Sequence, residues 1–137
     1  MSKNTIILVA ILVLLLGSVS YVTMFKEDKG CPKILRTVEH NLVSQADRWN
    51  FVPENITVNK CERVVLNVYN EDVYDHGIGI DLFGINKRMP PKATTTVEFT
   101  ATIKGEIPFI CSVACSSGIV DGKKRGHYDM IGKIIVK

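Results

Sequence analysis

Apolar and polar residues alternate in short runs from residue 38 to the end of the chain, and proline, asparagine and aspartate separate the runs. In the segment 62–69, ERVVLNVY, the apolar side chains of Val64, Leu66 and Val68 would lie on one face of an extended strand. Such alternation is typical of a strand with one face in a hydrophobic core. β-Branched residues, which favour strands, also dominate the segments 94–101 and 132–137.

Two segments that contain glycine and proline, 84–93 and 103–108, are predicted to form turns between strands. No pattern typical of an amphipathic helix follows residue 50. Roughly seven or eight short strands separated by turns are expected. This spacing predicts an all-β domain, either a β-sandwich or a Greek-key barrel.

The beginning of the chain has a different pattern. Residues 5–25 contain no charged side chain, and a helix of that length would span the hydrocarbon core of a bilayer, which is about 30 Å thick. We therefore expect an N-terminal transmembrane anchor and short linker in residues 1–29, and a folded domain in residues 30–137. A cleaved signal peptide ending near Ser18 or Ser20 is the alternative interpretation. Both interpretations export the domain, and the anchored form would be a single-pass protein of the cell membrane with its C-terminal domain outside.

Charge and cysteine content narrow the function classes further. The chain carries 17 basic and 14 acidic side chains, a balance that gives no support for nucleic-acid binding. In an oxidising compartment, Cys31 and Cys61 could form a disulfide that ties the linker to the domain. The sequence alone leaves the pairing of the four cysteines open.

The C-terminal part of the chain concentrates side chains that bind soft metals. Cys111 and Cys115 are followed by His127 and Met130, just ahead of the last predicted strand. Thiolate, imidazole and thioether ligands together favour copper. A loop with these three ligand types, joined by one more histidine, is typical of electron-transfer copper sites. The pattern therefore predicts a copper site that needs a second histidine.

Two further histidines are available to complete this set. His76 follows a loop at the start of a predicted strand, where it could lie over the same end of the domain. His40 lies in an early alternating segment and is interpreted as an ordinary surface or edge-strand residue. His76 is therefore the expected second histidine of the site.

Three stretches of the sequence resemble the CuA domain of cytochrome c oxidase subunit II: FVPENITVNKCERVVLNVYNEDVYDHGIGI, VEFTATIKGEIPFICSVAC and GHYDMIGKIIV. The resemblance covers nearly all of residues 45–137, and the single apolar N-terminal segment is similar to the short subunit II of B-type heme-copper oxidases. The resemblance implies a cupredoxin Greek-key barrel anchored by one transmembrane helix. It also implies a non-catalytic electron-entry subunit, which accepts electrons from a cytochrome c-like donor and passes them to heme in catalytic subunit I of the oxidase.

The resemblance further implies a binuclear CuA centre, in which two thiolates bridge two copper ions and two other ligands complete each ion. The implied bridges are Cys111 and Cys115. The implied terminal ligands are His76 and Met130 for one ion, and His127 and the main-chain carbonyl of Val113 for the other.

One departure from the family pattern is large. Eleven residues separate Cys115 from His127 where the family has three, so residues 118–125 are interpreted as an insertion in the ligand loop. We expect this insertion to bulge outward and leave the ligands in place, because each doubling of loop length costs only about 0.6 kcal/mol. The basic run 123–125 is interpreted either as a solvated loop tip or as a docking patch for an acidic donor.

Three other interpretations of the site remain open. Cys111 and Cys115 could form a disulfide with each other. Cys115 could instead bind a single copper in a blue-copper site, which would leave Cys111 without a role. The third interpretation is a membrane-tethered copper-delivery protein outside any oxidase, and co-purification with a heme protein would distinguish it from an oxidase subunit.

Overall fold

The computed structural model describes residues 30–137. The expected transmembrane anchor lies in residues 1–29, outside the described part of the chain. Within residues 30–137, no helix is long and apolar enough to cross a membrane. The domain boundary and the membrane anchor therefore stay predictions.

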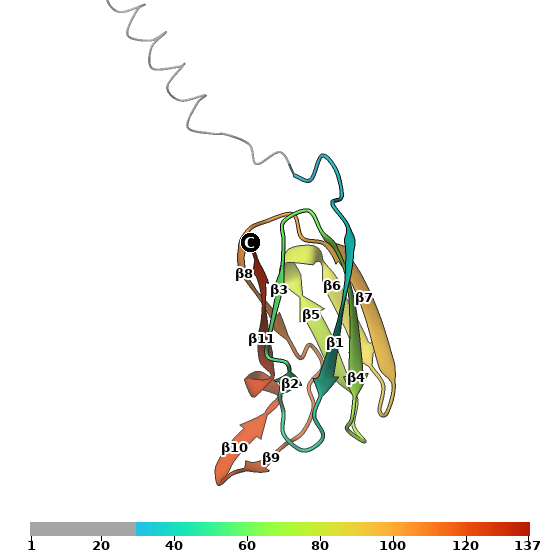
Figure 1. The fold of residues 1–137 in the computed structure, drawn as a ribbon. Coiled ribbons are helices and arrows are strands. Elements are labelled where there is room, and N and C mark those ends of the chain that lie inside the picture. The colour runs from blue at the N-terminus through green and yellow to red at the C-terminus, as the bar shows by residue number, and fades with distance from the viewer. Residues whose placement is uncertain (1–29) are drawn as a thin grey trace, which may run out of the picture.

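Two β-sheets pack face to face as a sandwich (Figure 1). The first sheet contains the strands β1 (Thr37–Ser44), β2 (Phe51–Val52), β4 (Arg63–Asn70) and β7 (Thr94–Thr100). The second contains β3 (Asn55–Val58), β5 (His76–Ile80), β6 (Ile85–Met89), β8 (Gly105–Ile110) and β11 (Ile131–Val136). A separate hairpin is formed by β9 (Ser117–Val120) and β10 (Lys123–Gly126). Two single-turn 3-10 helices complete the described chain, η1 (Asp81–Phe83) and η2 (His127–Asp129).

The strand order mixes parallel and antiparallel neighbours. It is β2-β1-β4-β7 in the first sheet and β3-β11-β8-β5-β6 in the second. β1 pairs with β4 in parallel, and β3 pairs with β11 in parallel, while the other neighbours are antiparallel. Chain segments therefore cross between the two sheets, as expected for a sandwich. The predicted all-β sandwich is confirmed.

The core lies between the two sheets and is built by the predicted alternation. Val64, Leu66 and Val68 of β4 are fully buried, as their period of two indicates. Phe51 of the first sheet meets Phe109 of the second edge to face, with ring centroids 5.3 Å apart. Such an aromatic pair contributes about 0.5–1.5 kcal/mol beyond the burial of its area. The core therefore fixes the two sheets against each other.

Two segments that were predicted as turns contain strands as well: the segment 84–93 has turns at residue 84 and at residues 91–92, with a strand between them, and the segment 103–108 runs into β8. Residues 85–89 form β6 at the edge of the second sheet, where most side chains are exposed and the apolar alternation is absent. In β8, Ile107 and Phe109 are buried while Pro108 points outward. The glycine and proline in these segments suggested turns, but pairing with neighbouring strands determines their conformation.

The first described residues are tied to the domain. The structure joins Cys31 to Cys61 by a disulfide, which confirms the pairing that the sequence left open. The main-chain N–H of Leu35 also donates to the carbonyl of Cys61 at 3.0 Å. In Figure 1 this segment enters at one end of the sandwich, and β9 and β10 project from the other end. We call the end that carries β9, β10 and η2 the hairpin end.

Candidate metal centre

His76 is the first residue of β5 and lies inside the hairpin end, with its side chain 1% exposed. Its Nδ1 lies 3.7 Å from Sγ of Cys111, and its Nε2 lies 3.2 Å from Oδ2 of Asp72. An ionised carboxylate can only accept hydrogen bonds, so Nε2 of the neutral imidazole carries the proton and donates to Asp72. Nδ1 therefore offers its lone pair toward Cys111.

Asp72 is a buried carboxylate in the loop between β4 and β5. It accepts the N–H of Val73 at 2.7 Å and the N–H of Asp47 at 3.4 Å, in addition to the bond from His76. Burial acts to raise the pKa of Asp72, but these hydrogen bonds, led by the one from His76, hold the pKa below its ordinary value. Asp72 therefore stays ionised and fixes the orientation of the imidazole.

The same loop is held by Asn70, the last residue of β4. Its side-chain amide donates to the main-chain carbonyls of Tyr74 at 2.8 Å and Met89 at 3.0 Å. Its Oδ1 accepts the N–H of Asp72 at 2.9 Å. Neither Asp72 nor Asn70 was predicted from the sequence as part of the site. Asp72 carried a signal, because histidine ligands commonly donate their second N–H to a carboxylate, whereas Asn70 carried none.

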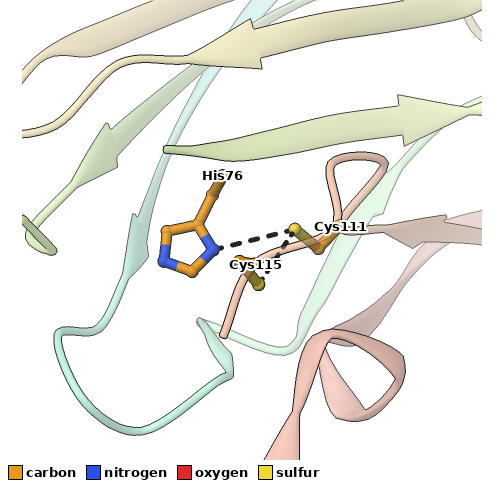
Figure 2. A group of neighbouring side chains, drawn as sticks. All are labelled: His76, Cys111 and Cys115. Atoms are coloured by element: carbon orange, nitrogen blue, oxygen red, sulfur yellow. Dashed lines mark hydrogen bonds between the residues drawn. The ribbon is translucent and has the colours of Figure 1, made fainter. Parts of the chain in front are cut away.

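The two cysteines of the candidate site face each other across a short loop that follows β8. Cys111 is buried and Cys115 is partly buried, and both thiols are free. Their sulfur atoms lie 3.8 Å apart, so the structure does not contain the disulfide between them that the sequence left open. Figure 2 shows both thiols and the imidazole of His76 pointing toward one another.

The surroundings of the two thiols differ, and so do their acidities. Burial acts to raise the pKa of Cys111, but the His76 imidazole, whose Nδ1 faces the thiol and can take its proton, and main-chain hydrogen bonds at Gly77 and Val113 lower the pKa below its ordinary value. Burial and the neighbouring Cys111 thiolate raise the pKa of Cys115. Cys111 is therefore the thiol that ionises first.

The main-chain carbonyl of Val113 lies in the middle of the cysteine loop. The Cys111 thiol donates to this carbonyl at 3.3 Å. The loop lies close against β5 at Gly77, where a Cβ atom would be 2.4 Å from Oγ of Ser112 and 2.9 Å from Cγ2 of Val113. Glycine at position 77 therefore allows the approach that places the carbonyl beside the thiol.

The remaining two predicted ligands lie at η2: His127 is its first residue, and Met130 follows it directly. Met130 is fully buried, with its sulfur 4.0 Å from Sγ of Cys115, and its carbonyl accepts the N–H of Cys111 at 3.0 Å. The His127 side chain lies near Cys111 and helps to lower the pKa of its thiol. Its Nδ1 is buried and has no hydrogen-bond partner among residues 30–137. An orphaned buried nitrogen is unusual and is explained if it binds a metal ion.

The insertion in the ligand loop projects from the sandwich as expected, and it does so as an ordered hairpin (Figure 1). β9 and β10 pair in register from Val120 opposite Lys123 to Ser117 opposite Gly126. The chain therefore leaves and returns at the same point, and the added residues do not separate His127 from Cys115.

The six predicted ligand residues gather at the hairpin end. The donor atoms of His76, Cys111 and Cys115 all lie within 4.8 Å of one another. The carbonyl of Val113 and the sulfur of Met130 each contact one of the two thiols, whereas His127 lies near Cys111 but outside the group of mutually close donor atoms. His40 lies in β1 and does not belong to this group of donor atoms. Thiol, imidazole and thioether donors in one buried cluster fit copper by the softness of their atoms.

Comparison with known families gives one match that covers most of the chain. A family described as a cupredoxin-like domain matches residues 8–136. No curated protein matches the sequence at a significant level.

Several solved structures have a similar fold. Auracyanin A, a "blue" copper protein from Chloroflexus aurantiacus, is 20% identical with a TM-score of 0.57, over 74% of this chain and 99% of its own. A chain of a heme-copper terminal oxidase dimer is 19% identical with a TM-score of 0.57, over 100% of both chains. The periplasmic domain of cytochrome oxidase subunit II of Bradyrhizobium japonicum is 17% identical with a TM-score of 0.54, over 78% of this chain and 87% of its own. At these identities the similarity shows the fold alone.

Proposed function

The chain belongs to the cupredoxin-like domain family, and on this premise we propose that it binds copper at the hairpin end and transfers electrons there. The observation that carries the proposal is the pair of free thiols, 3.8 Å apart, with His76 beside one sulfur and Met130 beside the other. A bound copper centre would take up and release one electron at a time.

We propose in particular the binuclear CuA form of the site. Both thiols belong to the cluster of donor atoms, and each has a different neighbour to complete the set. A blue-copper site would use one cysteine and leave the second buried beside the metal without a role. The six proposed ligands are His76, Cys111, the carbonyl of Val113, Cys115, His127 and Met130.

Contacts within the domain hold the proposed ligands in place without a bound metal. His76 is fixed by Asp72, and the cysteine loop is packed on β5 at Gly77. The carbonyl of Met130 is bonded to the N–H of Cys111, so η2 and the cysteine loop hold each other. Donors that are fixed in this way need little rearrangement when the charge at the site changes. Low rearrangement favours fast electron transfer.

We further propose that the chain is the electron-entry subunit of a heme-copper oxidase. In this role it would accept electrons from a cytochrome c-like donor and pass them to heme in catalytic subunit I. The fold similarity to oxidase chains supports the proposal, and so does the uncharged segment 5–25, which is long enough to anchor the domain in a membrane. The domain would then lie on the outer side of the cell membrane.

Metal analysis of the purified full-length protein tests the copper site. We expect about two coppers per chain, since two bridging thiolates are the reason for a copper pair. Cys111→Ser and Cys115→Ser should each lose the pair, and His40→Ala should bind copper as the wild type does. A wild-type protein that binds no copper would refute the proposed function.

Mild solubilisation of the native membrane tests the oxidase assignment. A heme-containing catalytic subunit should co-purify with the chain, and the heme should be reduced when electrons are supplied through the copper site. A copper-loaded protein that purifies without any heme protein would favour the copper-delivery alternative.

A further inference from the structure

The β9–β10 hairpin is held against the domain on one side. Gly118 of β9 packs on Trp49, where a Cβ atom would lie 2.4 Å from Cη2 of the indole ring. Asp121 at the tip of the hairpin pairs with Arg48 at 3.5 Å. Arg48 and Trp49 both lie in the loop between β1 and β2, so this loop supports one face of the hairpin.

The opposite face of the hairpin points outward. Successive strand residues alternate between faces, so Gly118 and Val120 lie on the supported face while Ile119 lies on the outward one. Ile119 pairs with Lys124 across the hairpin, which places these two side chains on the same face. Ile119 is 71% exposed, more than any other large aliphatic side chain among residues 30–137.

The outward face continues to the proposed copper site. A hollow of about 470 Å³ lies beside it, and its lining includes Lys124, Tyr128, Cys115 and His127. Tyr128 is 89% exposed and meets the His127 ring edge to face, with ring centroids 4.9 Å apart. The hollow therefore leads from exposed apolar and basic side chains to two of the proposed ligands.

The charge of the hairpin is positive on balance. Arg125 pairs with Asp129 at 3.8 Å, and Asp121 is paired with Arg48. Lys123 and Lys124 form no ion pair with any residue between 30 and 137. Lys124 therefore supplies positive charge beside the hollow, and Lys123, which pairs with Val120, adds positive charge at the tip of the hairpin.

We propose that the outward face of the β9–β10 hairpin docks a redox protein whose cofactor edge is surrounded by acidic side chains. This inference rests on the proposed function, because it assigns to that copper site the class of partner that exchanges electrons with it. Lys124 on this face, together with Lys123 at the tip of the hairpin, attracts the acidic rim and steers the encounter. Ile119 and Tyr128 supply the apolar contact that a small interface needs at its centre.

Succinylated cytochrome c is a suitable probe, because its lysines are converted to carboxylates around the heme edge, and unmodified basic cytochrome c is the matched comparison. Binding is measured on the full-length protein in detergent, with and without copper. The succinylated form should bind more tightly than the basic form. Lys123→Gln/Lys124→Gln should weaken its binding by about 3- to 10-fold at low ionic strength. The difference in binding between the wild type and this double variant should shrink above about 0.1 M salt, where the Debye length is about 10 Å.

Two further variants separate local docking from general charge. Lys33→Gln/Lys104→Gln removes the same charge from exposed positions outside the hairpin and should change binding by less than about 2-fold. Ile119→Ser should weaken binding at low and high salt alike, because apolar contact is not screened. Equal losses in the two lysine variants would overturn the proposal. So would tighter binding of basic cytochrome c, or lysine-dependent binding to anionic vesicles without binding of the succinylated probe.

The binding measurement does not depend on copper, so the two proposals fail separately. Lysine-dependent docking by a protein that takes up no copper would overturn the copper site and leave the docking face supported. Conversely, the protein could bind copper while its binding of the succinylated probe does not depend on the hairpin lysines. This result would overturn the docking face and leave the copper site supported.

Discussion

Replacing Asp72 by asparagine tests how strongly the polar network behind His76 controls the metal site. The wild-type carboxylate accepts the N–H from Nε2 of His76, which leaves Nδ1 free to bind metal. An asparagine that keeps its oxygen on the N–H of Val73 turns its amide NH₂ toward the imidazole. This amide donates to Nε2 and moves the imidazole proton to Nδ1, the nitrogen that faces Cys111.

The expected effect follows from the burial of this contact. Side chains that orient a metal ligand typically change metal affinity by about 10- to 100-fold when they are replaced, which corresponds to about 1.4–2.7 kcal/mol. The metal-free protein should also lose about 1–3 kcal/mol of unfolding free energy, because buried hydrogen bonds to a charged group are weakened. Both losses should occur together in Asp72→Asn.

Copper affinity is measured by competition with a chelator of known affinity, and stability by denaturant unfolding with the disulfide intact. Asp75→Asn is the matched control, because Asp75 precedes His76 directly but points to Arg88 at the surface. Loss of the Asp75 carboxylate should change copper affinity by less than about 2-fold, as expected for an exposed ion pair. Equal copper affinity in Asp72→Asn and the wild type would refute the argument that Asp72 sets the tautomer of His76.

Three further predictions concern other parts of the domain. Met130→Leu should retain copper while its reduction potential shifts, because a thioether is a weak ligand that mainly tunes the potential; loss of the copper in metal analysis would contradict this. Hydrogen bonds from Asn59 hold the pKa of Glu62 at about 2, below its ordinary value of 4.5. Its carboxylate therefore stabilises the fold above about pH 4.5, and roughly 3 kcal/mol of unfolding free energy is lost as the pH falls toward 2. The unfolding free energy of Glu62→Gln should lack this pH dependence, and a variant with the same pH profile as the wild type would contradict the prediction. Gly118→Val should displace the hairpin from Trp49 and change the fluorescence of this single tryptophan, whereas an unchanged spectrum would show that the packing is loose.

Much of the sandwich could be predicted because its strands keep a period of two. Val64, Leu66 and Val68 are buried as that period requires. The segment 85–89 lacks this signal because β6 is an edge strand with exposed side chains. Its pairing with β5 is made by main-chain groups, which the side-chain pattern does not reveal.

The hairpin in the ligand loop carried a local signal that the bulge interpretation overlooked. Asp121 and Gly122 both have positive φ, 49° and 77°. An Asp-Gly pair with two positive φ values is typical of a tight two-residue hairpin turn. The contact of Gly118 with Trp49 had no such signal, because it joins residues far apart in the sequence.

The two cysteines, two histidines and methionine of the site were predicted from their chemistry and order in the sequence, and Val113 from the resemblance to the CuA domain, but their surroundings were not predicted. The free state of Cys111 and Cys115 depends on a separation of 3.8 Å that no spacing rule supplies. Likewise, the Asp72 carboxylate reaches His76 only because the loop between β4 and β5 folds back, held by Asn70. Tertiary contacts of this kind decide the acidity and orientation of the donors.

Electron paramagnetic resonance of the oxidised, copper-loaded protein tests the central claim most directly. If Cys111 and Cys115 both bridge, one unpaired electron is shared by two copper ions, and the spectrum should show hyperfine structure from two equivalent nuclei. Cys111→Ser and Cys115→Ser should each abolish that signal, while His40→Ala should leave it unchanged. A spectrum from a single copper nucleus of the blue type, at one copper per chain, would contradict the binuclear site.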